Sequence, residues 1–304
     1  MVNFSVIPVF VTVVESGSFS LAGERLGITK SAISKRINQL ERDLGVQLIH
    51  RSTRRLSLTE AGEQYYDSVR KAFDLASEAE DNITERQNKP SGSLRINAPM
   101  AFGRLHLSRL TAAFLKQYPD INVDLMMDDK IVGLVADRFD IAIRIGDLAD
   151  SSLVARRLAP CRRVLCASPE YVQRFGLPDT PEQLHQHNCL FYSYFQAGSE
   201  WGFIGSDSVI KVLPRGNFKA NNSEAIREAL LAGLGIADMP TFIVGPDLAS
   251  GSLIPLMSHY RLPEHAIYAV FPERKHLPTK VRVFIDFLLD QLDQNTPYWD
   301  AGAD

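Results

Sequence analysis

Two short helical patterns separated by a glycine constrain this chain more than any other feature. Ser18 is placed to cap a helix that Gly27 ends, and Thr29 is placed to cap a second helix that Gly45 ends with a left-handed turn. Two short helices joined through Gly27 and Ile28 are typical of a helix-turn-helix, whose second helix enters the major groove of DNA. The apolar residues that recur at helical spacing are Phe19, Ala22 and Leu26 in the first helix, and Ala32, Ile33, Ile37, Leu40 and Leu44 in the second.

The face of the second helix opposite this apolar stripe is rich in hydrogen-bond donors. A helix in the major groove reads base edges mainly through residues near its own N-terminus. Arg36 and Arg42 lie further round and suit phosphate contacts or internal ion pairs. The residues predicted to read bases are therefore Thr29, Lys30, Ser31, Ser34 and Lys35.

Residues 46–58 predict a basic β-hairpin, a wing, behind the second helix. Two short β-prone runs flank a turn that carries Arg51, Arg54 and Arg55. Arginines in this position suit phosphate or minor-groove contacts, which raise affinity and make it depend on salt. The alternative is a solvated basic surface on an ordinary helical domain, since charge runs often mean no more than that.

These residues resemble the LysR-type transcriptional regulators. Two positions depart from the family pattern: Gly23 stands in place of the usual alanine and should cost the helix on the order of 1 kcal/mol, and Ile49 stands in place of the usual phenylalanine. The resemblance rests on four motifs, namely F-x-x-V-x-x-x-G-S-F at Phe10 to Phe19, A-x-x-x-L-G-I-T-x-S-A-I-S at Ala22 to Ser34, I-x-x-L-E-x-x-L-G-V-x-L at Ile37 to Leu48, and R-x-T-R-R-L-x-L-T-E-A-G at Arg51 to Gly62.

The resemblance implies a fold of three parts. We expect an all-α winged helix-turn-helix domain over residues 1–58, which includes a scaffold helix at 3–15. A linker helix should follow over 59–89, and an effector-binding domain over 90–304. That domain should consist of two doubly wound α/β lobes, as in periplasmic binding proteins, with lobe I near 92–162 and 267–304 and lobe II near 163–266.

Charge and length agree with this division. The 304 residues are 45% hydrophobic and long enough for at least two cores. Residues 1–58 hold eight Lys and Arg against four Asp and Glu, a net charge of +4, which leaves −7 for the remainder of a chain whose total is −3. A basic head on an acidic body indicates a nucleic-acid contact confined to one end.

The linker helix is predicted to pair with a second copy of itself. Thr59 is placed to cap it, and almost thirty helical residues would span about 43 Å. One apolar seam on so exposed a rod needs a partner, although packing against its own chain is the alternative. In the family this pairing is antiparallel and builds dimers, then tetramers, that act on double-stranded DNA, with RNA polymerase as a possible partner. The seam consists of Tyr65, Val69, Ala72, Phe73, Ala76, Ala79 and Ile83.

Beyond a hinge at Asn88 to Ser93, strands alternate with helices, which calls for a mainly parallel sheet. In such a sheet, ligands bind beyond the carboxyl ends of the strands, often at helix N-termini that favour anions. We therefore expect a small carboxylate effector between the lobes, with Arg144 helping to hold the anion and Phe102 or Phe195 the apolar part. Each residue has a plainer reading as an ion-pair partner, core residue or helix cap. The predicted effector-binding set is Pro99, Met100, Ala101, Phe102, Arg144, Gly146, Phe195, Asn222, Ser223 and Pro240.

Other function classes find little support in the sequence. No nucleophile elbow, phosphate-binding loop or zinc-protease motif occurs, so neither an enzyme, nor a cofactor, nor a metal is expected. Cys161, Cys166 and Cys189 have no metal-ligand spacing; a redox switch is the alternative to three buried apolar thiols. The N-terminus lacks a basic leader and no apolar run is long enough for a bilayer, so a cytoplasmic location without membrane contact is expected.

Two further expectations remain open at this point. A solute-binding or sensor protein, whose head serves only assembly, is the alternative to a DNA-binding regulator. The last ten residues, NTPYWDAGAD, are polar and are expected to be frayed.

Overall fold

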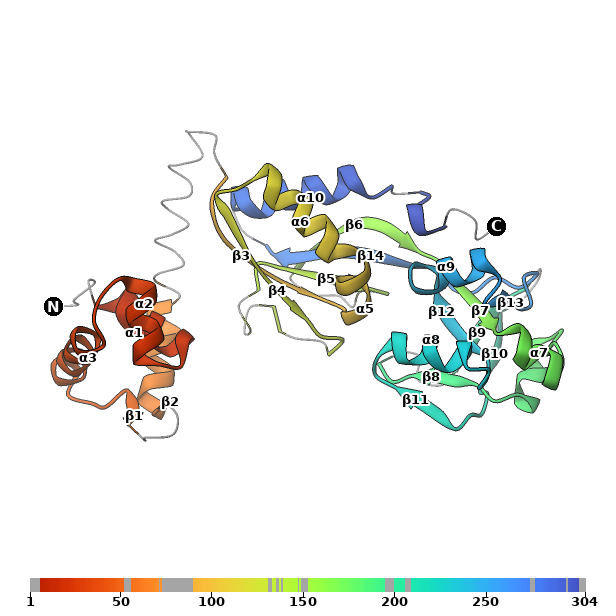
Figure 1. Ribbon diagram of the computed structural model, residues 1–304, viewed down its shortest axis with the longest axis horizontal. Coiled ribbons are helices and arrows are strands. Elements are labelled where there is room, and N and C mark those ends of the chain that lie inside the picture. The colour runs from red at the N-terminus through yellow and green to blue at the C-terminus, as the bar shows by residue number, and fades with distance from the viewer. Residues whose placement is uncertain are drawn as a thin grey trace. The chain divides into compact units, whose positions relative to one another are not determined.

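The chain forms two compact units, residues Met1–Asn88 and Lys89–Asp304 (Figure 1). The computed structural model describes residues 6–51, 56–70, 72, 90–130, 133, 134, 137, 139–146, 148, 153–194, 200–205, 209–273, 277–293 and 295–300. Among these residues, no helix combines the length and the apolar character that crossing a membrane requires.

The first unit begins with the three helices α1 (Ile7–Ser16), α2 (Phe19–Leu26) and α3 (Lys30–Leu44). Pro8 lies in the first turn of α1 and so begins the helix rather than breaking it, because that turn needs no N–H from residue 8. The Ser18 hydroxyl accepts from the N–H groups of Ser20 and Leu21, and the Thr29 hydroxyl accepts from the Ala32 N–H at 3.2 Å. Both predicted caps are confirmed.

The core of this unit lies between α1 and the apolar stripe of α3. Phe10 of α1 and Ile33 and Ile37 of α3 are fully buried. Leu44 is 43% exposed, so its predicted place in the stripe is wrong. The helix ends at this residue and Gly45 turns the chain away, which leaves the side chain at the rim.

Gly23 lies where the turn comes closest to α2. A Cβ at this position would be 2.7 Å from the Ile28 carbonyl oxygen, and the Ile28 N–H donates to the Gly23 carbonyl at 3.0 Å. The expected propensity cost of Gly23 is therefore opposed by a second effect, because a methyl group here would press on this backbone contact and something would have to shift.

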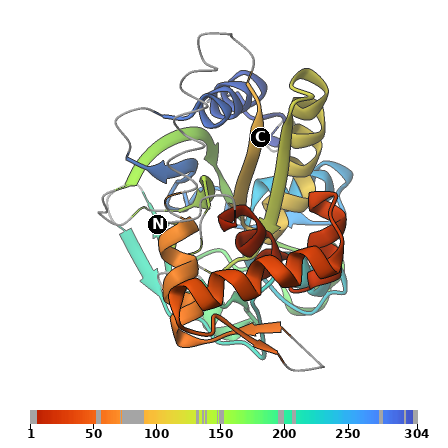
Figure 2. The same cartoon turned by 90° about the vertical axis from the view of Figure 1, so that its left-hand side faces the viewer.

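A hairpin of β1 (Ile49–Arg51) and β2 (Leu56–Leu58) follows α3 (Figure 2, in orange). Glu41 of α3 ties the two elements together, because its carboxylate accepts from the N–H groups of Leu48 and Ile49 at 2.9 and 3.1 Å. The tip of the predicted wing, with Arg54 and Arg55, lies outside the described residues.

The next helix begins after Thr59, whose hydroxyl accepts from the Gly62 N–H at 3.0 Å as predicted. It is described over residues 60–70 and at 72. Val69 is buried in the core of the first unit, and the Tyr65 ring packs edge-on against Phe10 at 5.5 Å between centroids. This start of the predicted seam thus packs on its own chain, and residues 73–89 lie outside the described residues.

The second unit contains a five-stranded sheet in the order β4-β3-β5-β14-β6, which we call the first lobe together with its helices (Figure 1). The strands β3, β4 and β5 are parallel, and β14 runs antiparallel to β5 and β6. Helices α6 and α10 contact each other and the sheet. The elements are β3 (Gly92–Ala98), α5 (Met100–Phe102), the π-helical turn η2 (Gly103–Leu107), α6 (Ser108–Gln117), β4 (Ile121–Met127), β5 (Ile141–Ile145), β6 (Leu153–Cys161), β14 (His265–Pro272) and α10 (Thr279–Gln291).

The second lobe is built on β7, which pairs antiparallel with β12 and β13. Strands β8 and β11 form a parallel pair, and β9 and β10 a hairpin. Parallel pairing thus joins β4, β3 and β5 of the first lobe and β8 and β11 of the second, and the other strand pairs of this unit are antiparallel. The elements are β7 (Arg163–Ala167), α7 (Pro169–Phe175), the 3-10 helix η3 (Pro181–Gln186), β8 (Leu190–Tyr192), β9 (Trp201–Ile204), β10 (Val209–Val212), β11 (Phe218–Ala220), α8 (Ser223–Leu231), β12 (Ala237–Pro240), α9 (Thr241–Ser250) and β13 (Ile254–Pro255).

Two features of this unit were not expected from the sequence. In strand β6 the first five residues, 153–157, are at least partly exposed and only the last four are buried, so no alternating pattern marks it as a strand. A helical pattern over 131–139, between two strands, falls largely outside the described residues. The predicted frayed tail is wrong for residues 295–300, where the 3-10 helix η4 (Tyr298–Asp300) places Trp299 in the core.

Candidate functional site

The N-terminal turn of α3 presents the side chains predicted to read bases. Lys30 is the first residue of the helix, and Lys30 and Lys35 are exposed. The Thr29 hydroxyl lies 3.0 Å from the Ser31 hydroxyl and also caps the helix, so its lone pairs are partly engaged. Ser34 is half-buried. The predicted set therefore shares one end and one face of α3.

The arginines beyond the first turn of α3 differ in their exposure and contacts. Arg36 is exposed. The Arg42 guanidinium donates to the Gln39 side chain at 2.7 Å, and Gln39 in turn donates to Asp43 at 2.6 Å. Arg42 thus makes an internal hydrogen bond to a neutral group, whereas the prediction was an ion pair or a phosphate contact. The side chain of Arg51, like Arg54 and Arg55, lies outside the described residues.

In the second unit, the carboxyl ends of the parallel strands β3, β4 and β5 share one edge of the sheet. The chain after β3 turns at Pro99 into the helix that starts with Met100. The Met100 N–H donates to the Asp129 carboxylate, which follows β4, at 2.8 Å. Gly146, after β5, has a φ of +118° and donates its N–H to the Ala266 carbonyl at 3.1 Å. These corners therefore meet at one edge, as the topology requires.

Arg144 and Asn97 form a polar pair beside this edge. The Arg144 guanidinium donates to the Asn97 side-chain oxygen at 2.6 Å and to the Ile143 carbonyl at 3.1 Å. Asn97 is fully buried. Desolvation by burial lowers the pKa of Arg144 from its ordinary value, which still leaves it charged at neutral pH. At least two of the groups that hold Arg144 in place are therefore neutral.

Asp129 connects the two lobes through a hydrogen bond to the Tyr192 hydroxyl at the end of β8. Desolvation raises the pKa of Asp129, while the bonds from Met100 and Tyr192 lower it, and the charges of Asp128 and Glu224 raise it. Desolvation and the Asp129 charge raise the pKa of Tyr192. Tyr192 is therefore the hydrogen-bond donor of this pair, and Asp129 the acceptor.

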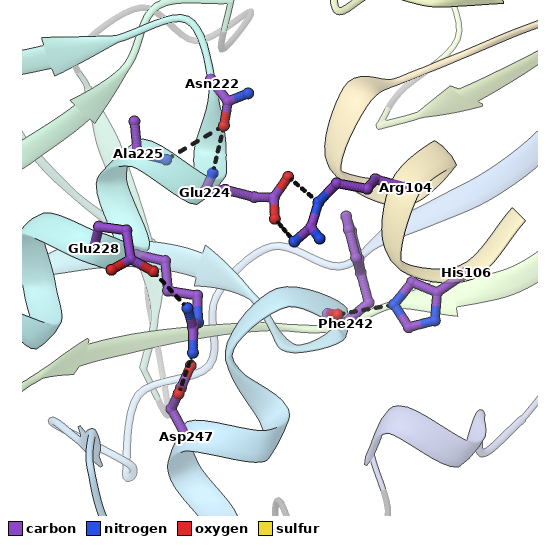
Figure 3. Close-up of polar contacts among 9 residues, drawn as sticks. Arg104, His106, Asn222, Glu224, Ala225, Glu228, Phe242 and Asp247 are labelled. Atoms are coloured by element: carbon purple, nitrogen blue, oxygen red, sulfur yellow. Dashed lines mark hydrogen bonds and ion pairs between the residues drawn. The ribbon is translucent and has the colours of Figure 1, made fainter. Parts of the chain in front are cut away.

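A second contact between the lobes joins Arg104 of η2 to Glu224 of α8 (Figure 3). The Arg104 Nε donates to one carboxylate oxygen at 2.9 Å and its Nη2 donates to the other. Asn222 caps α8 beside them, and its side-chain oxygen accepts from the N–H groups of Glu224 and Ala225 at 2.8 and 3.3 Å. Ser223, the first residue of α8, lies next to this cap and is half-buried.

The N-terminus of α9, after the predicted effector-binding residue Pro240, is the third helix start of this region, beside those of α5 and α8. Pro240 precedes the helix, and both the N–H and the hydroxyl of Thr241 donate to the Arg162 carbonyl, at 2.9 and 3.2 Å. The Phe242 carbonyl accepts from His106 Nε2 of the first lobe at 2.9 Å (Figure 3). All three helix starts therefore already have internal hydrogen-bond acceptors.

Two predicted aromatic residues have different outcomes. Phe102 is fully buried and packs edge-on against Phe242 and Trp299, with centroids 5.5 and 6.0 Å apart. It is therefore a core residue in this arrangement, which was the plainer reading, and the neighbouring Ala101 is buried too. Phe195 lies outside the described residues.

Sequence reasoning missed the residues that join the lobes. Arg104 and Glu224 are 120 positions apart, and Asp129 and Tyr192 belong to different lobes. A lone charge or tyrosine gives no signal of a partner so far along the chain. The only hint was position, since Asp129 follows a predicted strand and Glu224 a predicted cap.

The three cysteines are buried, as the plainer reading expected. Desolvation raises the pKa of Cys161 and of Cys189 to about 12, and it raises the pKa of Cys166 as well. Thiols of this kind are protonated at neutral pH and react slowly with oxidants. Within the described ranges, no three His, Cys, Asp or Glu side chains are grouped to hold a metal ion.

The chain matches two protein-family models. Residues 5–63 match the bacterial regulatory helix-turn-helix proteins of the lysR family, and residues 87–293 match the LysR substrate binding domain. The transcriptional regulator PtxR of Pseudomonas aeruginosa is 36% identical over 292 residues, which cover 95% of this chain and 93% of PtxR.

Solved structures of full-length regulators are similar as well. The virulence activator AphB of Vibrio cholerae, described as a member of the LTTR family, is 32% identical, with 95% of this chain and 99% of that chain covered and a TM-score of 0.63. CrgA, a LysR-type transcriptional regulator of Neisseria meningitidis, is 35% identical, with coverage of 95% and 99% and a TM-score of 0.62. Relatives of this kind favour a regulator over the alternative of a solute-binding protein. The chain belongs to the LysR family of DNA-binding transcriptional regulators, with an N-terminal helix-turn-helix domain and a C-terminal effector-binding domain.

Proposed function

We propose that a small carboxylate effector binds between the two lobes and changes how the head binds its promoter. The observation that carries this proposal is the meeting of Arg144 and the Met100 corner at the carboxyl edge of the first sheet. The start of α8 is joined to the same lobe by the Arg104–Glu224 pair. A ligand that binds more tightly to one arrangement of the lobes increases the fraction of molecules in that arrangement. A change in DNA affinity then follows from this difference in ligand affinity.

The backbone N–H groups at the helix starts already have internal acceptors, and an effector must compete with these acceptors. Asp129 already accepts from the Met100 N–H, and Asn222 from the Glu224 and Ala225 N–H groups. A carboxylate that binds here competes with them, while the Arg144 charge and the Ser223 hydroxyl offer further donors. We therefore expect an effector whose carboxylate pairs with Arg144 and whose remaining polar groups replace the lost internal bonds.

The head is proposed to read DNA with Thr29, Lys30, Ser31, Ser34 and Lys35 and to hold phosphates with Arg36 and the wing arginines, Arg51, Arg54 and Arg55. One head offers few base contacts, so specificity requires that two or more heads bind at a fixed spacing. We propose that the helix after Thr59 pairs two chains, over residues beyond Val69, and that two such dimers form a tetramer.

Isothermal titration calorimetry against a panel of aromatic and aliphatic carboxylic acids tests the effector class. Arg144→Ala should weaken any acid that binds by about 1.5–3 kcal/mol, the usual contribution of a hydrogen bond to a charged group. Ser223→Ala should weaken it by about 0.5–1.5 kcal/mol. Arg282→Ala, on the exposed side of α10, and Ser258→Ala, in an exposed turn, are matched controls.

Arg144→Ala also removes a partner of the buried Asn97, so the unfolding transition of each variant must be measured beside its affinity. The carboxylate proposal fails if acids bind equally well to wild type, Arg144→Ala and Ser223→Ala in folded protein.

A further inference from the structure

The C-terminal segment 295–300 contacts both lobes and the crossing between them (Figure 1). Trp299 is 6% exposed and Asp300 is 4% exposed. Burial of this extent requires packing partners, and these partners come from three separate parts of the effector-binding domain.

The first set of partners belongs to the first lobe. The Tyr298 hydroxyl and His106 Nδ1 are 2.6 Å apart. The Trp299 ring lies 4.7 Å from the His106 ring and 6.0 Å from the Phe102 ring, measured between centroids. The Arg109 guanidinium lies over the Tyr298 ring at 5.1 Å. The segment is therefore attached to the helix formed by α5, η2 and α6.

The second set belongs to α9 of the second lobe. The Phe242 ring packs against the Trp299 ring at 6.4 Å between centroids, with an interplanar angle of 71°. A Cβ at Gly245 would lie 2.5 Å from the Trp299 carbonyl oxygen. Only glycine allows the backbone of the segment to approach α9 this closely.

The third partner is Arg162, the single residue between β6 of the first lobe and β7 of the second. Its guanidinium pairs with the Asp300 carboxylate at 3.0 Å and donates to the Asn295 carbonyl at 3.2 Å. Its own carbonyl accepts from Thr241 of α9. The side chain and the backbone of Arg162 thus link the chain end, the crossing and the second lobe.

We propose that segment 295–300 is a brace that sets the angle between the two lobes, with Trp299 and Asp300 as positioning residues. A segment attached to the first lobe, to α9 and to the crossing at once must shift whenever the lobes rotate, because its three sets of partners move apart. The brace acts on lobe geometry itself and does not depend on which effector binds.

The hydrogen bonding of segment 295–300 suits a contact that can open and close. Among the described residues, neither Trp299 Nε1 nor Asp300 Oδ1 has a hydrogen-bond partner, although both atoms are buried. Unpartnered buried polar atoms offset part of the stabilisation from packing.

Double electron–electron resonance on the full-length chain tests the brace. One spin label is placed at Lys116→Cys on α6 and the other at Gln173→Cys on α7, both exposed positions on different lobes. The native thiols are buried, so labelling is directed to the introduced ones. Labelled protein is diluted with unlabelled protein so that distances between subunits do not contribute.

Four variants are compared in this background. Trp299→Ala and Asp300→Asn remove brace contacts. Trp201→Ala and Asp124→Asn are the controls, because Trp201 packs on Phe191 inside the second lobe and Asp124 pairs with Arg95 inside the first. The melting temperature of each variant is measured to record its loss of stability.

The brace predicts that Trp299→Ala and Asp300→Asn displace or widen the distance distribution between the lobes, whereas the two controls keep the wild-type distribution. A wild-type distribution in both brace variants would overturn the proposal and leave the segment as core packing only. If Trp299→Ala fails to fold, Asp300→Asn decides the question alone: a changed distribution supports the brace and an unchanged one refutes it.

Discussion

Arg104 and Glu224 lie 120 positions apart and meet in a two-pronged ion pair that joins the first helix of one lobe to the start of α8 in the other. The Arg104 side chain is 60% exposed, so water and salt screen the pair and its contribution to stability is small. Because the pair joins the two lobes, it forms only in lobe arrangements that bring η2 and α8 together.

A double-mutant cycle measures this pair. Arg104→Ala, Glu224→Gln and the double variant should yield a coupling energy of about 0.2–1 kcal/mol in urea unfolding at low salt, with less at high salt. The exposed pair of Lys211 and Glu200, inside the second lobe, is a matched control for screening. A coupling above about 3 kcal/mol would show that the pair is desolvated and that this account of it is wrong.

His106 predicts a pH dependence of the stability of the effector-binding domain. Desolvation lowers its pKa, the Phe242 carbonyl raises it, and the Arg109 charge lowers it again. Because the folded pKa lies below the ordinary value of about 6.5, the folded state favours the neutral ring. The associated stability is complete above about pH 6.5 and is lost as the pH falls toward the folded pKa.

Urea unfolding at pH 7.5 and pH 5.5 checks this expectation. His106→Asn should shrink the stability difference between the two pH values, although it destabilises the protein at both. His187 also has a pKa lowered by desolvation, so His187→Asn should shrink the difference too, whereas exposed His185→Asn is the control. An undiminished difference in His106→Asn would show that His106 does not titrate in this way.

Replacing Gly23 with alanine is expected to lower the stability of the first unit, although alanine has the higher helix propensity. A Cβ there would press on the Ile28 carbonyl at 2.7 Å, so Gly23→Ala should destabilise the head by about 1–3 kcal/mol. Exposed Ser20→Ala, in the same helix, should have little effect. Thermal unfolding of the first unit is measured for both variants. A Gly23→Ala variant that is more stable than the wild type would contradict the close backbone contact.

The buried thiols predict chemical inertness. At pH 7.5 none of the three cysteines should react with a thiol-specific reagent over the lifetime of the native state, and all three should react in denaturant. This follows from burial, which raises the pKa of Cys161 and Cys189 to about 12 and keeps the thiolate scarce. A thiol that reacts rapidly in the folded protein would favour the redox alternative instead.

Local signals in the sequence predicted much of the fold. The caps at Ser18, Thr29 and Thr59 and the strand–helix alternation that begins at β3 depend on residues close in sequence, and the structure has them where the pattern indicates. Strand β6 was not predicted because residues 154–157, which include Arg156 and Arg157, are all exposed at the edge of the sheet. Apolar and polar residues therefore do not alternate there.

Contacts between distant segments were out of reach. The polar tail NTPYWDAGAD looks unstructured, and Trp299 is buried only because Phe102, His106 and Phe242 form a site for its ring. Asp129 and Tyr192 likewise meet only after the two lobes have formed. In each case the partner is set by tertiary packing, and one sequence holds no local trace of it.

Fluorescence anisotropy with DNA selected from a random library by the intact protein tests whether the N-terminal turn of α3 reads the base sequence. Lys30→Ala should weaken binding to the selected DNA by about 1–3 kcal/mol and change binding to random DNA little, while Arg54→Ala should weaken both alike and reduce the salt slope by about one unit. Lys116→Ala, in the effector-binding domain, is the control. Equal losses on selected and random DNA for Lys30→Ala would contradict this proposed role of α3.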